Sequence, residues 1–162
     1  MAAPTPSVPG TPTGHKLGDG YQTRVAFAGN LTISFWEKAV TAPGVDGGAE
    51  IDTTTMHNVH WRTMAPRTLV TMTAFSMTVG WDPALYTAIL AMLNVPTTVT
   101  VVFPDGSSIC FFGYLKSFKP GSMEEGKFPE ATIEVSPTNT DPTTCAEEAP
   151  VFTAGIGTYT HC

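Results

Sequence analysis

The chain has 162 residues, and its 14 acidic and 8 basic side chains give a formal net charge of −6. This length suits one domain with a hydrophobic core, and the bases are scattered singly instead of forming the basic patch that stable nucleic-acid binding needs. Charged residues make up only 14% of a sequence with 15 glycines and 14 prolines, a composition typical of strands and turns.

The first segment, residues 1–20, contains prolines and glycines but almost no apolar side chains, so it predicts an N-terminal arm outside the core. Its start lacks the basic and apolar regions of a secretory signal. The sequence also contains no run of about 18 apolar residues, which is the length that would predict a membrane span. We therefore expect synthesis in a cytoplasm.

Two alternating segments come next, 21–28 and 31–36, and Gly29-Asn30 between them predicts a tight hairpin turn. A longer extended segment is predicted from Thr68 to Val79, and neither of its faces carries a charge. Both faces are therefore expected to meet something, either a neighbouring subunit or the interior of the chain's own domain. The candidate positions for such a contact on these extended segments are Thr32, Ser34, Trp36, Thr71, Thr73, Phe75 and Met77.

A long acidic segment around residues 41–55 lies between the extended segments 31–36 and 68–79. It has no cation between Lys38 and Arg62, and loops of this length are usually functional or disordered. We interpret it as a contact with a neighbouring subunit, with Arg62, Arg67 and Lys116 as possible basic partners. The contact residues are Pro43, Gly44, Val45, Asp46, Gly47, Gly48, Ala49, Glu50, Ile51 and Asp52.

One helix is predicted over about 82–94, with Asp82 as the N-cap and Pro83 at the first helical position. After it, 97–103 and 108–118 predict a hairpin around a Pro-Asp-Gly-Ser turn, and 131–135 predicts the last strand. The order of elements favours a mainly β fold, an antiparallel sandwich or barrel with one flanking helix and extended terminal arms. The expected division is an N-terminal arm (1–20), a β domain (21–140) and a C-terminal extension (141–162).

No catalytic constellation accompanies these elements, and we expect neither an enzyme nor a bound cofactor or metal. His57 and His60 lie three residues apart in a segment that favours extended structure, where such spacing points side chains to opposite faces. Cys110, Cys145 and Cys162 lack zinc-site spacing and are expected to be reduced, with a Cys145–Cys162 bridge left open. The three tryptophans are expected to pack in the core or at an interface.

Several short motifs follow one another in a consistent order after the acidic segment. They are Trp61-Arg62-Thr63, Trp81-Asp82-Pro83, Phe103-Pro104-Asp105-Gly106, Phe112-Gly113-Tyr114-Leu115 and Pro137-Thr138-Asn139-Thr140. Together they resemble the major tail tube proteins of long-tailed, non-contractile bacteriophages, over roughly residues 20 to 140. The resemblance implies a β-sandwich or barrel with a flanking helix that assembles into hexameric rings, which stack into a hollow tube.

The resemblance implies a structural virion protein of the tail that is assembled in the host cytoplasm and whose tube conducts DNA during ejection without binding it specifically. Partners would be further copies of the chain, a tape measure protein, a tail terminator and a distal tail protein. A secretion-system tube subunit or a tail terminator is an alternative with the same architecture. A β-sandwich that binds carbohydrate or a cell surface through exposed tryptophans is a second alternative.

Overall fold

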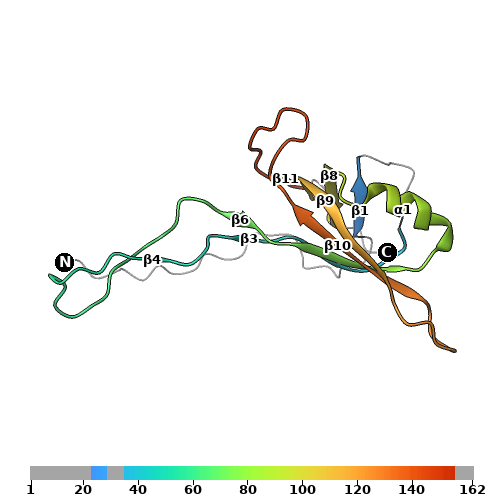
Figure 1. Cartoon of the computed structure of the whole chain (residues 1–162), viewed down its shortest axis with the longest axis horizontal. Coiled ribbons are helices and arrows are strands. Elements are labelled where there is room, and N and C mark those ends of the chain that lie inside the picture. Colours follow the sequence, from blue (N-terminus) through green and yellow to red (C-terminus); the bar gives the residue numbers. More distant parts are fainter. Residues whose placement is uncertain (1–22, 29–34, 156–162) are drawn as a thin grey trace.

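The computed structural model describes residues 23–28 and 35–155. A compact body lies at one end of the molecule, and a long arm projects from it (Figure 1). The body is built on one antiparallel sheet with the strand order β1-β8-β9-β10-β7-β2 and with β11 beside β9. Its strands are β1 Arg24–Phe27, β2 Glu37–Thr41, β7 Phe75–Gly80, β8 Thr97–Val102, β9 Ser108–Pro120, β10 Glu130–Pro137 and β11 Val151–Thr153. The prediction of a mainly β, antiparallel fold with one flanking helix is confirmed.

The hydrophobic core lies on one face of this sheet. Buried and less buried side chains alternate along the central strands because successive residues of a strand point to opposite faces. Phe75, Val99, Val101, Ile133 and Val135 are completely buried. The opposite face of the sheet is rich in hydroxyl side chains, including Ser76, Thr78, Thr98, Thr100 and Thr132. It also carries four charged residues, Arg24, Lys119, Glu130 and Glu134.

The predicted strand from Thr68 to Val79 is wrong as one element. The sheet strand β7 begins only at Phe75, and the preceding β6, Thr71–Met72, pairs outside the main sheet. The side chains of Phe75 and Met77 are buried in the chain's own core. Of the two expectations for this segment, contact with a neighbouring subunit or burial in its own domain, these two residues follow the second.

The two outer strands of the sheet approach each other. The backbone N–H of Val25 in β1 donates to the Glu37 carboxylate in β2 at 3.1 Å. Next to this bond, the rings of Phe27 and Phe35 meet edge to face with centroids 6.0 Å apart. The sheet thus curls toward a barrel. The predicted turn at Gly29-Asn30 and the positions Thr32 and Ser34 lie outside the described residues.

The helix is present where it was predicted, as a 3-10 turn η1, Pro83–Leu85, that continues into α1, Tyr86–Met92. The Asp82 carboxylate accepts the Ala84 N–H at 2.9 Å and so caps the first turn. Asn94 ends the helix with a φ of 60°, a conformation that asparagine tolerates better than most residues. Ile89 and Met92 are buried against the sheet.

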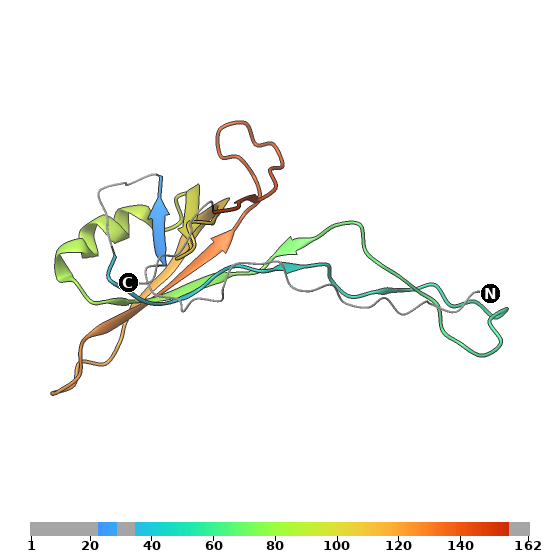
Figure 2. The same ribbon diagram turned by 180° about the vertical axis from the view of Figure 1, so that it is seen from behind.

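The predicted hairpin is confirmed, with β8 and β9 pairing from Thr97↔Gly113 to Val102↔Ser108. The C-terminal extension contributes more than a loose tail, because β11 pairs with the start of β9 through Val151↔Cys110 and Thr153↔Ser108. β10 and β11 therefore lie one after the other along the same side of β9. The helix and the loop between β9 and β10 lie at the end of the body far from the arm, as Figures 1 and 2 show from opposite sides.

Candidate assembly surfaces

The acidic segment predicted as a loop forms one side of a two-stranded arm. β3, Val45–Asp46, pairs with β6, and β4, Ile51–Asp52, pairs with β5, Met64–Ala65. We call residues 44–71 the arm. The sequence prediction missed β5, which is only two residues long, and placed β6 within a longer strand from Thr68 to Val79.

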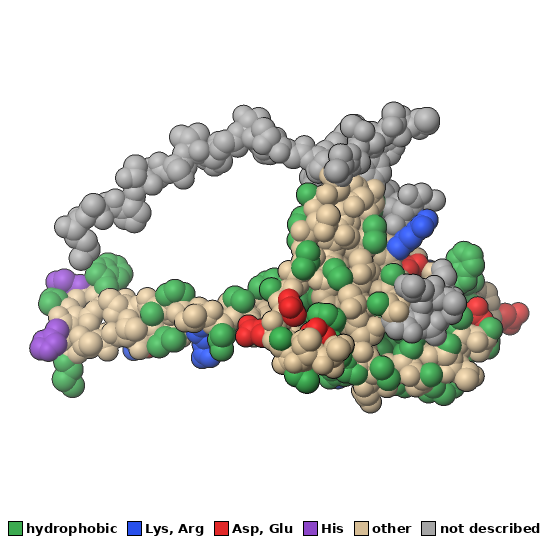
Figure 3. Space-filling model, turned by 90° about the horizontal axis from the view of Figure 1, so that it is seen from above, with side chains coloured by type: hydrophobic (Ala, Val, Ile, Leu, Met, Phe, Trp, Pro, Cys, Tyr) green, Lys and Arg blue, Asp and Glu red, His purple; other side chains and the backbone are tan. Residues whose placement is uncertain are grey.

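The arm contains no buried residue, and Asn58 and Ala65 are its only partly buried ones. Half of the large hydrophobic side chains that are exposed among residues 23–28 and 35–155 lie on it, and Figure 3 shows hydrophobic groups along its length. An isolated two-stranded hairpin is marginally stable in water, so this surface calls for a partner. The exposed hydrophobic residues are Val45, Ile51, Met56, Val59, Trp61, Met64, Leu69 and Val70.

Two of the three expected basic partners lie within the same arm as the acidic residues. The guanidinium of Arg62 approaches Asp52 to 3.8 Å, and Nε of Arg67 donates to the Ala49 carbonyl at 2.8 Å. Hydrogen bonds from the hydroxyl and the N–H of Thr54 hold the pKa of Asp52 below its ordinary value. Lys116 is exposed on β9 in the body. Arg67 thus stabilises its own arm, whereas Arg62 makes only a long contact within it. Arg62 and Lys116 are therefore left as candidates for a contact between copies.

The base of the arm is fixed to the body by Thr73. Its hydroxyl accepts the Gly44 N–H at 2.8 Å, and its own N–H donates to the Gly44 carbonyl at 2.9 Å. Pro43 and Met72, the neighbours of this pair, are buried. Thr71 and Thr73 are exposed, unlike Phe75 and Met77 of the same predicted set.

The tip of the arm, residues 53–63, is held in shape by Asn58. Its carboxamide oxygen accepts the N–H of Thr55 at 2.9 Å and the Thr55 hydroxyl at 3.1 Å, and its amide donates to the Trp61 carbonyl at 3.0 Å. A backbone bond from Thr53 to Thr63 closes the loop below. Met56, Val59 and Trp61 are more than 80% exposed on this ordered loop.

The tryptophans do not form one surface. Trp36 in the body is 73% exposed and Trp61 at the arm tip is 84% exposed, so neither packs in the chain's own core, and an interface position stays a prediction for both. Trp81 stacks on Phe118 with centroids 5.7 Å apart and packs in the body. Because the exposed tryptophans belong to different parts of the molecule, they provide no shared platform for a sugar.

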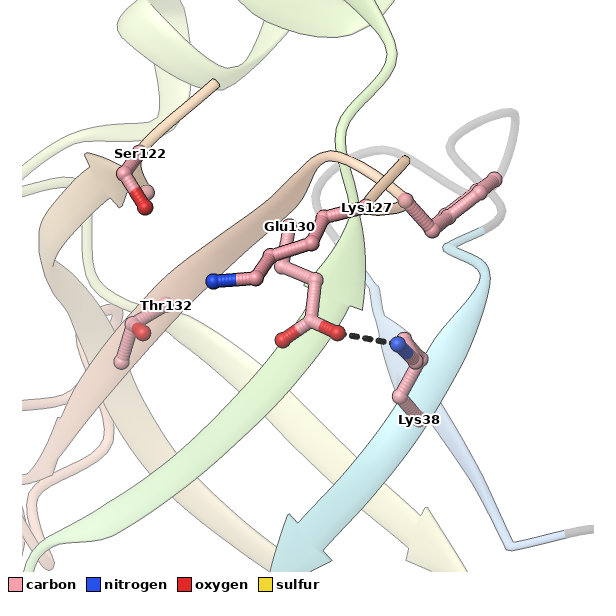
Figure 4. A pocket seen from close by; sticks show the side chains of 7 residues that line it. Lys38, Ser122, Lys127, Glu130 and Thr132 are labelled. Carbon is pink, nitrogen blue, oxygen red and sulfur yellow. Dashed lines mark hydrogen bonds and ion pairs between the residues drawn. The ribbon is translucent and has the colours of Figure 1, made fainter. Parts of the chain in front are cut away.

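A shallow groove lies where β2 meets the β9–β10 hairpin. Lys38 and Glu130 form an ion pair at its centre, and the ammonium group of Lys38 lies 5.5 Å from the centre of the Phe128 ring (Figure 4). Lys127, which also lines the groove, pairs with Glu124. Each lysine is therefore matched by a carboxylate, and the groove does not gather charge of one sign.

Neither metal nor membrane chemistry is indicated by the described part of the chain. No group of three or more metal-ligating side chains occurs there. His57 and His60 are exposed near the arm tip, where Figure 3 shows the histidines at the end far from the body. No described helix is long and apolar enough to cross a bilayer. Cys110 and Cys145 are free thiols, and Cys162 lies outside the described residues.

Comparisons with known proteins identify the fold. No family model and no curated protein matches the sequence. Among solved structures, the chain is similar to a chain of a native gene transfer agent virion, with a TM-score of 0.60 and 12% identity over 85% of this chain and 100% of the other. The chain therefore shares its fold with this virion chain.

Two further structures extend this result. A chain from the tail of an empty gene transfer agent particle with C6 symmetry matches with a TM-score of 0.56 and 11% identity, over 85% of this chain and 100% of that one. A chain from the 6-fold symmetrised baseplate of the anti-feeding prophage matches with a TM-score of 0.57 and 8% identity, over 83% and 92%. At these identities the likeness concerns the fold.

Proposed function

We propose that this chain is a structural subunit of a phage tail or tail-like particle and that it polymerises as stacked, hexameric rings into the tail tube. The arm carries this proposal, because an ordered projection of 28 residues without one buried side chain has no role within a single subunit. The likeness to chains of particles with sixfold symmetry supports it.

A tube needs two kinds of contact in each subunit, one that closes the ring and one that joins successive rings. The arm supplies a surface for the second, and its acidic residues Asp46, Glu50 and Asp52 face neighbours there. The body supplies the first. In the assembled virion, further contacts would be with a tape measure protein, a distal tail protein and a tail terminator.

The hydroxyl-rich face of the sheet suits the wall of a DNA conduit. Every phosphate that a lysine or arginine neutralises adds affinity for DNA and slows its passage. The outward residues of β7 and β8 are uncharged. On the neighbouring strands, Glu130 and Glu134 add two carboxylates and Arg24 and Lys119 add two cations, so the face carries no excess of positive charge. DNA is therefore expected to pass without specific binding. The subunit has no enzymatic role in this assignment, and its place is the virion tail.

Electron microscopy of the purified protein tests the proposal directly. We expect negatively stained rings or tubes at high protein concentration, with sixfold symmetry in end views. A dispersed monomer at every concentration would contradict it. Rings that never stack would favour a tail terminator, and tubes obtained without any phage-related partner would not separate a phage tube from a secretion-system tube.

A further inference from the structure

The helix end of the body presents an exposed surface without charge. From Pro83 to Pro96 the sequence contains no acidic or basic residue, although Tyr86, Leu90 and Val95 are 41%, 48% and 50% exposed. A helix at a solvated surface normally carries charged side chains on its outer face. This outer face therefore has the character of an interface.

The arm tip has matching chemistry. Residues 53–61 contain no aspartate, glutamate, lysine or arginine, and they expose the apolar side chains of Met56, Val59 and Trp61. The hydrogen bonds of Asn58 hold the loop in shape before any partner arrives. Such preorganisation lowers the entropy that is lost on binding, and aromatic anchors dominate the energy of many interfaces.

The positions of the two surfaces determine which molecule can join them. Arm and helix lie at opposite ends of the long axis of the molecule (Figures 1 and 2), so a subunit cannot dock its tip on its own helix. A second copy can. The contact joins two different surfaces and is heterologous, so each copy keeps a free arm and a free helix for the next.

Charges at the rim of the two surfaces are complementary. Arg62 follows Trp61 and is 78% exposed at its side chain, with only a long contact to Asp52. Asp82 lies one turn before Tyr86 at the start of the helix. The guanidinium and this carboxylate therefore offer charges of opposite sign beside the two apolar surfaces.

We infer that the tip of the arm of one copy docks, through Met56, Val59 and Trp61, on the outer face of α1 of the next copy along the tube. This inference deepens the proposed function and rests on it. It assigns a partner surface to the tip of the arm. The acidic side of the arm would then run along the body of the next copy toward its helix.

Photochemical cross-linking tests the contact. The full-length chain with the photoreactive residue benzoylphenylalanine in place of Trp61 is mixed with an isotope-labelled copy, assembled and irradiated. We expect cross-linked peptides that join the arm tip to residues 83–96 of a differently labelled copy. Cross-links to the β9–β10 loop at 121–129, or only within one copy, would overturn the docking.

Charge insertion gives a second measurement. Leu90→Lys and Ala91→Lys place a cation on the outer face of the helix, and lysine is a good helix former that suits the last helical turn. Burying this charge should raise the critical concentration for assembly by about tenfold or more. Ala149→Lys, at an exposed alanine of the C-terminal loop, is the matched control and should assemble like the unaltered chain.

The outcomes separate this inference from the proposed function. Tubes that form equally well with Leu90→Lys, and that give no cross-link to 83–96, would overturn the docking while the tube assignment stands. An unaltered chain that stays monomeric and gives no cross-link between copies would overturn both. Circular dichroism of each variant shows whether the monomer is folded, and a variant that folds but fails to assemble supports the docking.

Discussion

The backbone N–H of Val25 donates to Oε1 of Glu37 at 3.1 Å, and this bond joins the two outer strands of the sheet. Edge strands with free hydrogen-bonding groups invite pairing with other chains. By occupying one donor of β1, the Glu37 carboxylate restricts which part of the edge can meet a neighbouring subunit.

Glu37→Ala should destabilise the body by about 1–3 kcal/mol, because it leaves a partly buried N–H without its acceptor. Glu37→Gln keeps an oxygen in place and should cost clearly less. Urea denaturation of the monomer, followed by tryptophan fluorescence, measures both. Equal losses for the two variants would mean that the charge, and not the hydrogen bond, matters.

Replacing residues 46–71 by Asn-Gly should leave a folded body that no longer forms tubes. The change keeps the Val45↔Met72 pair and closes it with a sequence that favours a two-residue hairpin turn. No buried side chain is removed, so the thermal unfolding midpoint should stay within a few degrees of the original. Sedimentation measures assembly, and tubes of normal length from this variant would exclude the arm as the contact between rings.

If the hydroxyl-rich face lines a conduit as we propose, Thr78→Lys should make this surface retain DNA. Thr78 lies between the buried Met77 and Val79 and therefore points to the hydroxyl-rich face. Assembled tubes of this variant should bind a short fluorescent duplex more tightly than unaltered tubes, and the gain should disappear as salt is raised. Ala149→Lys is again the control. Equal binding by both lysine variants would show that the hydroxyl-rich face does not line the channel.

Acid should loosen the turn at Asp141. Its carboxylate accepts the Thr143 N–H at 2.8 Å and the Thr144 hydroxyl at 2.9 Å, and these bonds, the first above all, lower the pKa of Asp141 below its ordinary value. A lowered pKa in the folded state means that this stabilisation is fully present above the ordinary value of 3.8 and is lost as the pH falls through the folded value.

Carbon NMR of the Asp141 carboxyl group measures this titration. Asp141→Asn keeps an oxygen that can accept the same bonds, so its turn should persist without a pH dependence of its own. A midpoint at or above 3.8 in the unaltered chain would contradict the expectation.

Sequence patterns predicted the elements that have a helix cap, helical spacing or strand alternation within their own residues. The Asp82-Pro83 start and the spacing of Ile89 and Met92 were sufficient for the helix, and alternation was sufficient for β8, β9 and β10. The arm was only half predicted, because its ladders are short and the pairing of β4 with β5 depends on residues far apart in the sequence. The segment from Thr68 to Val79 contains no charged residue, but its two halves differ in structure. The second half is a buried strand of the body, and the first half belongs to the exposed arm.

The candidate site was predicted with similar limits. The importance of the segment at 43–52 followed from its length and acidity, yet the partners proposed for it, Arg62 and Arg67, belong to the same arm. Met56 and Val59 at the tip gave no signal in the sequence, because single apolar residues among threonines and histidines resemble any surface loop. Only the structure shows that Asn58 presents them together.

Because the arm contains no buried residue, the residues needed for folding and those available for assembly lie in different parts of the sequence. If the arm joins subunits as we propose, mutations between Gly44 and Thr71 should change assembly with little effect on folding of the body, while mutations in β7 to β10 should do the reverse. Arms of altered length or chemistry could then be exchanged on one body to give subunits that polymerise only with their own kind, without redesign of the core.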